Sequence, residues 1–294
     1  MSAQNLDATS GGSWLNTRSK DGRFELHGLI PGRYMLMASA GGPEYPGDRR
    51  APARQRQAAF QVVELGIADL DGVTVTLEQG ETLRGRVRFE GGMPPAGVST
   101  DMAVHLGPPF ASRFDVHGWR AFVRADSTFQ LDSVFRLPRV VGMTGLPRGW
   151  VLRAVRHAGR DITSMPVEFG AGAGAHPVEV VVTNRVARLT VRVLDERAKA
   201  GAARAVLLSV DPVRTSVTYP TLSDRPVDGG EETFAAVLPG TYLLAAVSDV
   251  DVHALLVDRG RVEALAKAAV RVTLEEGEHR TIEVTRSPLP ETGR

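Results

Sequence analysis

The chain has 294 residues, and its 35 lysines and arginines against 34 acidic residues leave a formal charge of +1. This length suits about two or three domains, each able to bury its own core. So balanced a charge favours neither nucleic acid nor an anionic membrane surface as a partner. The chain has no cysteine, which excludes disulfides, thiolate nucleophiles and thiolate metal sites.

Residues 1–10 are polar and lack the basic and apolar regions of a secretory signal. No stretch approaches the ~20 apolar residues that a membrane-spanning helix requires. We therefore predict no signal peptide and no membrane span in this chain.

The first predicted elements surround two turns, Asp21-Gly22 and Pro31-Gly32. Phe24 and Leu26 lie two positions apart and therefore point to the same face of a strand. Tyr34 follows the second turn, where it can bury its ring while its hydroxyl reaches a backbone group at a sheet corner. We read all of these residues as structural.

Further along the chain, apolar and polar residues alternate with the period of a half-buried strand in Val73–Leu77, Leu83–Phe89 and Val270–Leu274. Many short strands separated by frequent turns indicate a sandwich or barrel. One helix is predicted, over Arg259–Ala268, with Val262, Leu265 and Ala269 on a shared face.

Internal repeats indicate that one structural unit has been copied. The segment from Asp21 to Leu36 reappears from Gly230 to Leu244, and a looser copy begins at Ala125.

A second repeated element, V-T-V-T-L-E-Q-G-E at Val73–Glu81 and V-R-V-T-L-E-E-G-E at Val270–Glu278, closes each unit, with Val178–Thr183 in that place in the middle copy. We therefore expect a first repeat over residues 1–81, a middle repeat over 82–186, a third repeat over 187–286 and a tail over 287–294. The first repeat begins shortly before its Asp21-Gly22 turn, so we expect its opening strands to be missing from a truncated or mis-started chain, with an exposed sheet edge.

The pattern D-G-x-F-x-L-x-G-L-x-P-G-x-Y resembles the signature of carboxypeptidase-regulatory-like domains. In the third repeat Phe234, Pro239, Gly240 and Tyr242 match it, although Glu231-Glu232 replaces Asp-Gly. The middle repeat keeps Phe129 and Leu131, with Leu146-Pro147 after an inserted strand. In the first repeat the match comprises Asp21, Gly22, Phe24, Leu26, Gly28, Leu29, Pro31, Gly32 and Tyr34.

This resemblance implies an all-β chain of tandem transthyretin-like or immunoglobulin-like seven-stranded sandwiches, the first incomplete. It also implies an extracellular, periplasmic or cell-surface bacterial protein whose partners are proteins or polysaccharides of the cell envelope. The expected function is that of a non-catalytic accessory or spacer module.

We find no local signature of a catalytic, metal or cofactor site, so we predict no enzyme activity and no cofactor. The seven histidines are scattered singly, without a second ligand at metal-binding spacing. Gly170–Ala175 lies between two strands and reads as a flexible loop. Asp249, Asp251 and Asp258 read as a solvated loop, because the calcium-loop glycine and closing glutamate are missing.

An alternative function is a carbohydrate- or polymer-binding module. Its candidate platform is Trp119, at the start of a predicted strand, where we expect an exposed ring, whereas Trp150 alternates with Leu152 and reads as core. A Lys–Asn cross-link of the collagen-adhesin type is excluded in the middle repeat, which has no lysine, and Lys199 lies in a predicted turn. Leu289–Gly293 matches the sortase pentapeptide, without the apolar segment that should follow it.

Overall fold

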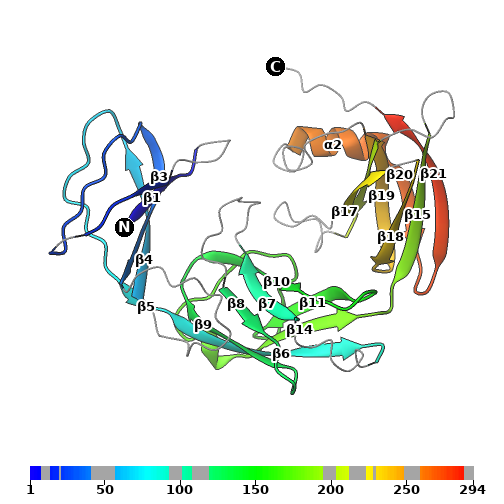
Figure 1. Ribbon diagram of the computed structural model, residues 1–294, viewed down its shortest axis with the longest axis horizontal. Helices are drawn as coiled ribbons and strands as arrows, with labels where there is room; N and C mark the ends of the chain where they lie inside the picture. Colours follow the sequence, from blue (N-terminus) through cyan, green and yellow to red (C-terminus); the bar gives the residue numbers. More distant parts are fainter. Residues whose placement is uncertain are drawn as a thin grey trace. The chain divides into compact units, whose positions relative to one another are not determined.

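A computed structural model describes residues 1–7, 14–19, 21–40, 57–92, 101–107, 119–194, 203–211, 223–227, 230–247 and 259–287. Almost all of the regular secondary structure in this part of the chain is β-strand, arranged in several sheets, as the alternation predicted (Figure 1). None of its helices is long and apolar enough to cross a membrane. Two compact units are distinguished: unit 1 is Met1–Leu83, Gln130–Leu137 and Glu168–Ala175, and unit 2 is Arg84–Phe129, Pro138–Val167 and His176–Arg294.

The first repeat contributes one sheet to unit 1. Its strand order is β2 (Trp14–Asn16), β1 (Ser2–Asn5), β3 (Gly32–Ala40), β4 (Gln57–Leu65) and β5 (Glu78–Gln79).

Two expectations for this region need correction. The opening strands are not wholly missing, because β1 and β2 precede the Asp21-Gly22 turn, and Ala3 of β1 is fully buried opposite Leu36 of β3. Val73–Leu77 is not a strand, although its side chains alternate between half-buried and exposed. Alternation reports which face of a segment is covered, whereas a strand also needs a hydrogen-bonded neighbour.

The middle repeat has two sheets. One has the order β13 (Val167–Glu168), β10 (Pro138–Thr144), β7 (Ala103–Gly107) and β8 (Trp119–Phe122). The other has the order β12 (Arg160–Asp161), β11 (Val151–His157), β14 (Val178–Thr183), β6 (Glu81–Glu90) and β9 (Thr128–Val134). The loop at Gly170–Ala175 contains one turn of 3-10 helix, Ala173–Ala175.

The first and last strands of the middle repeat run parallel. Strand β14 pairs with β6 from Val178↔Gly85 to Thr183↔Glu90. Gly85 is required here, because a Cβ atom on it would lie 2.2 Å from Cζ of Phe129 and 2.3 Å from the Val178 carbonyl oxygen. The missing side chain lets the buried Phe129 ring lie directly over β6.

The third repeat repeats this arrangement. Its path is β17 (Ser223–Val227), β16 (Ala203–Ser209), β19 (Gly240–Val247), β21 (His279–Ser287), β15 (Ala187–Leu194) and β18 (Glu231–Val237), with β20 (Val270–Leu274) paired to β19. Strand β15 runs parallel to β21 and antiparallel to β18. Figure 1 shows these three strands side by side. Leu189, Val191 and Val193 of β15 are each 0% exposed in the core.

The predicted helix is present as α2 (Arg259–Ala268). Val262, Leu265 and Ala269 all pack against the outer face of β16 and β19, at Val206 and Ala245. The predicted shared face is therefore confirmed.

The alignment of Val270–Glu278 with Val73–Glu81 as closing elements was wrong for the third repeat. Strand β20 pairs with β19 as β4 pairs with β3, and β21 is the strand that closes the repeat. Both segments read as alternating valines before an acidic turn, and only strand pairing distinguishes the last strand from the one before it. The three repeat boundaries stay predictions.

Candidate functional site

The turn residues of the shared motif have the backbone angles that their residue types suggest. Asp21 and Gly22 have φ of 53° and 77°, and both are exposed. Gly32 and Gly240, at equivalent places before a tyrosine, have φ of 154° and 152°, where other residues are strained.

The tyrosine that follows each Pro-Gly turn makes the same contact in two repeats. The Tyr34 hydroxyl donates to the Ile30 carbonyl at 2.8 Å, and the Tyr242 hydroxyl donates to the Leu238 carbonyl at 2.7 Å. Both rings are buried. Each tyrosine thus ties the incoming chain to the strand that follows, which is the contact expected from the sequence.

Asp7 accepts two further hydrogen bonds at the first of these corners, both from Arg33, the residue before Tyr34. Its carboxylate accepts hydrogen bonds from the Arg33 backbone amide at 2.7 Å and from Arg33 Nε at 2.9 Å. The backbone bond, followed by the side-chain bond, lowers the pKa of Asp7.

The other motif residues differ between repeats in how deeply they lie. Phe129, Leu131 and Phe234 are buried, whereas Phe24 and Leu26 are only half-buried. Pro31 and Pro239 are exposed at their turns. The first repeat therefore covers its motif less completely.

Trp119, the candidate ligand platform, begins β8 and is half-buried. The guanidinium carbon of Arg139 lies 4.7 Å from the centroid of its ring. One ring face therefore carries a cation–π contact and is not open for stacking on a sugar. Trp150, by contrast, is 7% exposed, as expected of a core residue.

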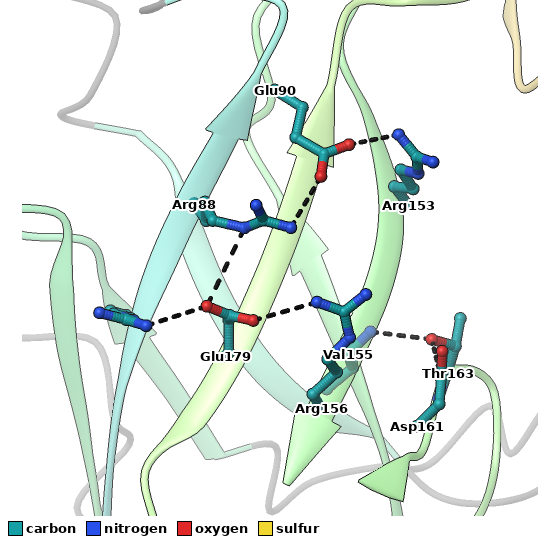
Figure 2. A network of polar contacts seen from close by, with 9 residues as sticks. Arg88, Glu90, Arg153, Val155, Arg156, Asp161, Thr163 and Glu179 are labelled. Carbon is teal, nitrogen blue, oxygen red and sulfur yellow. Dashed lines mark hydrogen bonds and ion pairs between the residues drawn. The ribbon is translucent and has the colours of Figure 1, made fainter. Parts of the chain in front are cut away.

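The candidate functional site that the structure assembles is a charged surface on β6, β14 and β11, which we call the arginine face (Figure 2). Its residues are Arg86, Arg88, Glu90, Arg153, Arg156 and Glu179. The sequence showed alternating arginines along β6, but the other members come from strands far along the chain. No sequence signal linked them.

Glu179 lies at the centre of the arginine face, because β14 runs between β6 and β11. Its Oε1 lies 3.1 Å from Nη2 of Arg86 and 3.9 Å from Nε of Arg88, and its Oε2 lies 3.3 Å from Nη1 of Arg156. The side chain is only 21% exposed. Three cations thus converge on one partly covered carboxylate.

Glu90 completes the face. It pairs with Arg88 at 2.7 Å and with Arg153 across β14. The face therefore combines four guanidinium groups with two carboxylates, a surplus of two positive charges. Guanidinium groups arranged in this way suit carboxylate or phosphate groups of a partner.

The hydroxyl group of Thr163 makes two hydrogen bonds beside the arginine face. The Thr163 hydroxyl accepts a hydrogen bond from the Val155 amide at 2.8 Å and donates one to Asp161 Oδ1 at 2.6 Å. Figure 2 shows these two hydrogen bonds at the edge of β11. It fixes the hairpin that carries Arg156.

The structure brings together two histidines that are separate in the sequence. The ring centroids of His157 and His176 are 6.3 Å apart. Burial, and secondly the charge of His176, lower the pKa of His157. Within the described ranges, no group of three potential metal ligands occurs. The segments with Asp249, Asp251, Asp258, Lys199 and Leu289–Gly293 lie outside the described residues.

No family model matches the chain, and no curated protein matches it in sequence. Among solved structures, it is similar to a streptococcal ancillary pilin, at 11% identity over 70% of this chain and 69% of that one, with a TM-score of 0.24. The Bacillus anthracis TIE protein gives 12% identity over 97% of this chain, with a TM-score of 0.25, and this chain spans 51% of its length. Shaft pilin SpaA from Lactobacillus rhamnosus GG gives 9% identity over 70% of this chain and 98% of that one, with a TM-score of 0.25.

Removing one buried hydroxyl tests the tyrosine corner. Tyr242→Phe keeps the ring but leaves the Leu238 carbonyl without its donor, so the opening free energy of β19 amides falls by about 1–2 kcal/mol in hydrogen exchange. The matched control is Thr241→Val, which removes an exposed hydroxyl facing Thr273 at 3.1 Å. If both variants lowered the opening free energy of the β19 amides by the same amount, the buried tyrosine hydrogen bond would contribute no more stability than the contact between Thr241 and Thr273.

Neutralising the central carboxylate tests the arginine face. Glu179→Gln leaves three arginines facing one another, so exchange protection of β14 falls by about 1 kcal/mol at low salt and by less at high salt, where charges are screened. Glu231→Gln is the control, because Glu231 pairs mainly with Arg192, at 2.8 Å, and is 51% exposed. A loss that is the same at both salt concentrations would contradict an electrostatic origin.

Proposed function

We propose that this chain is a non-catalytic, tension-bearing spacer or accessory module of a bacterial cell-envelope protein, built from carboxypeptidase-regulatory-like sandwich repeats. The observation that carries the proposal is the parallel pairing of the first and last strands, β6 with β14 and β15 with β21. In both repeats, the chain enters and leaves through strands that are neighbours in one ladder.

This geometry determines how a pulling force acts. The third repeat is entered at the start of β15 and left at the end of β21, and the two strands are paired from Arg188↔His279 to Leu194↔Thr285. A force along the chain therefore runs parallel to both strands and perpendicular to their hydrogen bonds. The whole ladder is loaded together, instead of one bond at a time.

The connection between the two ladders is short. Strand β14 ends at Thr183 and β15 begins at Ala187. The Arg188 amide donates to the Glu278 carbonyl at 2.8 Å, so the pairing begins where the connection ends. This supports our boundary between a middle repeat over 82–186 and a third repeat over 187–286; the boundary of the first repeat, over 1–81, rests on the sequence repeats.

An extracellular, periplasmic or cell-surface location belongs to the same proposal, with proteins or polysaccharides of the cell envelope as partners. The motif resemblance supports the location. The surplus charge of the arginine face supports an anionic envelope polymer as a partner more strongly than Trp119 supports a stacked sugar, since Arg139 occupies one face of that ring.

Single-molecule pulling tests the mechanical role. The chain contains no cysteine, so paired substitutions to cysteine give unique attachment points. Handles at Arg188→Cys and Arg286→Cys shear the β15–β21 ladder, and we expect a several-fold higher unfolding force than with handles at Arg188→Cys and His279→Cys, which separate the strands one pair at a time. Equal forces in the two geometries would remove the support for tension bearing.

Fractionation of native cells tests the location. Mass spectrometry of cytoplasmic, periplasmic and membrane fractions is expected to find peptides of this chain in an exported fraction. Recovery from the cytoplasm alone would overturn the envelope proposal and leave an intracellular scaffold.

A further inference from the structure

The side of the sheet that carries the arginine face has more positive charge than its own glutamates balance. Arg84 is exposed on the same side of β6 as Arg86 and Arg88, so it lengthens the row of arginines by one position. With Arg84 included, five guanidinium groups and two carboxylates lie on this side of β6, β14 and β11. These strands therefore present a surplus of three positive charges, whereas the whole chain has a formal charge of only +1.

An irregularity in β11 places both of its arginines on this face. Arg153 and Arg156 are three positions apart, a spacing that regular alternation would assign to opposite sides of a strand. The register of β11 against β14 shifts between Leu152 and Ala154, as in a β-bulge, and Ala154 and Val155 are consecutive buried residues. Figure 2 shows both arginines paired with a glutamate of the face. Bulges re-aim side chains in this way beside functional sites.

The two glutamates hold the guanidinium groups without using most of their donors. Each guanidinium has three nitrogen atoms and five N–H donors. The ion pairs with the glutamates involve two nitrogen atoms of Arg88 and one nitrogen atom each of Arg86, Arg153 and Arg156. Both glutamates are 21% exposed, whereas these arginines are 46–69% exposed. The guanidinium groups are thus held in position while their remaining donors face solvent, which lowers the entropic cost of binding an anion.

The spacing of the guanidinium groups indicates a ligand whose charges are also spaced. Arginines at alternate positions of β6 are about 7 Å apart, because a strand rises about 3.3 Å per residue. The arginines of β6 and β11 are separated by the intervening strand β14, a distance of about 10 Å. Both distances are comparable with the length of a sugar unit. Glu90 and Glu179 show that the guanidinium groups of this face bind carboxylates.

We propose that the arginine face, together with Arg84, binds a polysaccharide that carries one carboxylate per sugar unit, a polymer of uronic acids. This inference rests on the proposed function and names the chemistry of the envelope polymer. Guanidinium groups form strong, charge-assisted hydrogen bonds with carboxylates. The nearly neutral chain has no global attraction for a polyanion as densely charged as nucleic acid, whereas a local surplus of three charges suits a sparser one.

The test uses the purified full chain and a fluorescent oligomer of galacturonic acid. We expect saturable binding that weakens as salt is added, because the contacts are between charges. The methyl-esterified oligomer has the same sugar backbone without the charges, and we expect it to bind at least tenfold more weakly. Equal binding of the ester and the acid would overturn the proposal.

Matched variants locate the site. The double variant Arg86→Gln, Arg153→Gln removes one charge from each outer strand of the face and is expected to weaken binding at least tenfold. The control is Arg192→Gln, Arg280→Gln, which removes two arginines of the third repeat that are 53% and 46% exposed and is expected to bind like the parent chain. Hydrogen exchange of β14 amides verifies that the first variant keeps its sheet. Unchanged binding by the first variant, or equal losses in both, would overturn the proposal.

Two measurements on the parent chain need no substitution. Side-chain NMR signals of the face arginines are expected to shift when the oligomer is added, while those of Arg192 and Arg280 stay in place; the reverse pattern would overturn the proposal. Tighter binding of a polyphosphate with the same number of charges would overturn it in favour of a phosphate-bearing polymer. Absence of binding at low salt would overturn this inference alone, since the pulling and fractionation experiments test the spacer role and the location separately.

Discussion

The parallel ladder between the first and last strands of the middle and third repeats is the pairing that joins the strands on either side of it into one sheet. In the third repeat β15 pairs on both sides, so it holds β18 and β21 in one sheet and inserts three fully buried side chains into the core. Strand β6 has the same position between β14 and β9. In the first repeat, residues 24–29 and 73–77 belong to no strand among the described residues, although their apolar side chains are half-buried.

The tyrosine corner is a contact between residues close in sequence, and it does not depend on this ladder. Tyr34 makes its backbone hydrogen bond in the first repeat, just as Tyr242 does in the third. Both bonds reach back four residues across a Pro-Gly turn. Since the contact is short-range in sequence, it forms wherever the turn and the buried ring are present.

The arginine face, in contrast, depends on contacts between strands that are distant in sequence. The alternation of Leu83–Phe89 correctly predicted which side of β6 is apolar and which side carries its arginines. It did not predict that Glu179 and Arg156 complete the network, because these come from strands that are distant in sequence. A cross-strand ion pair depends on which strands are neighbours and in what register.

The sequence by itself determined the class of the fold, the position of helix α2, the two tyrosine corners and the inward faces of most strands, because periodicity and turn chemistry are local properties. Only the tertiary structure decided that β1 and β2 precede the first turn, that β21 rather than β20 closes the third repeat, and that Val73–Leu77 remains outside any strand. Each of these outcomes depends on a hydrogen-bonded partner far along the chain. A strand's pattern shows which of its faces is buried, but the identity of its neighbour is a property of the assembled sheet.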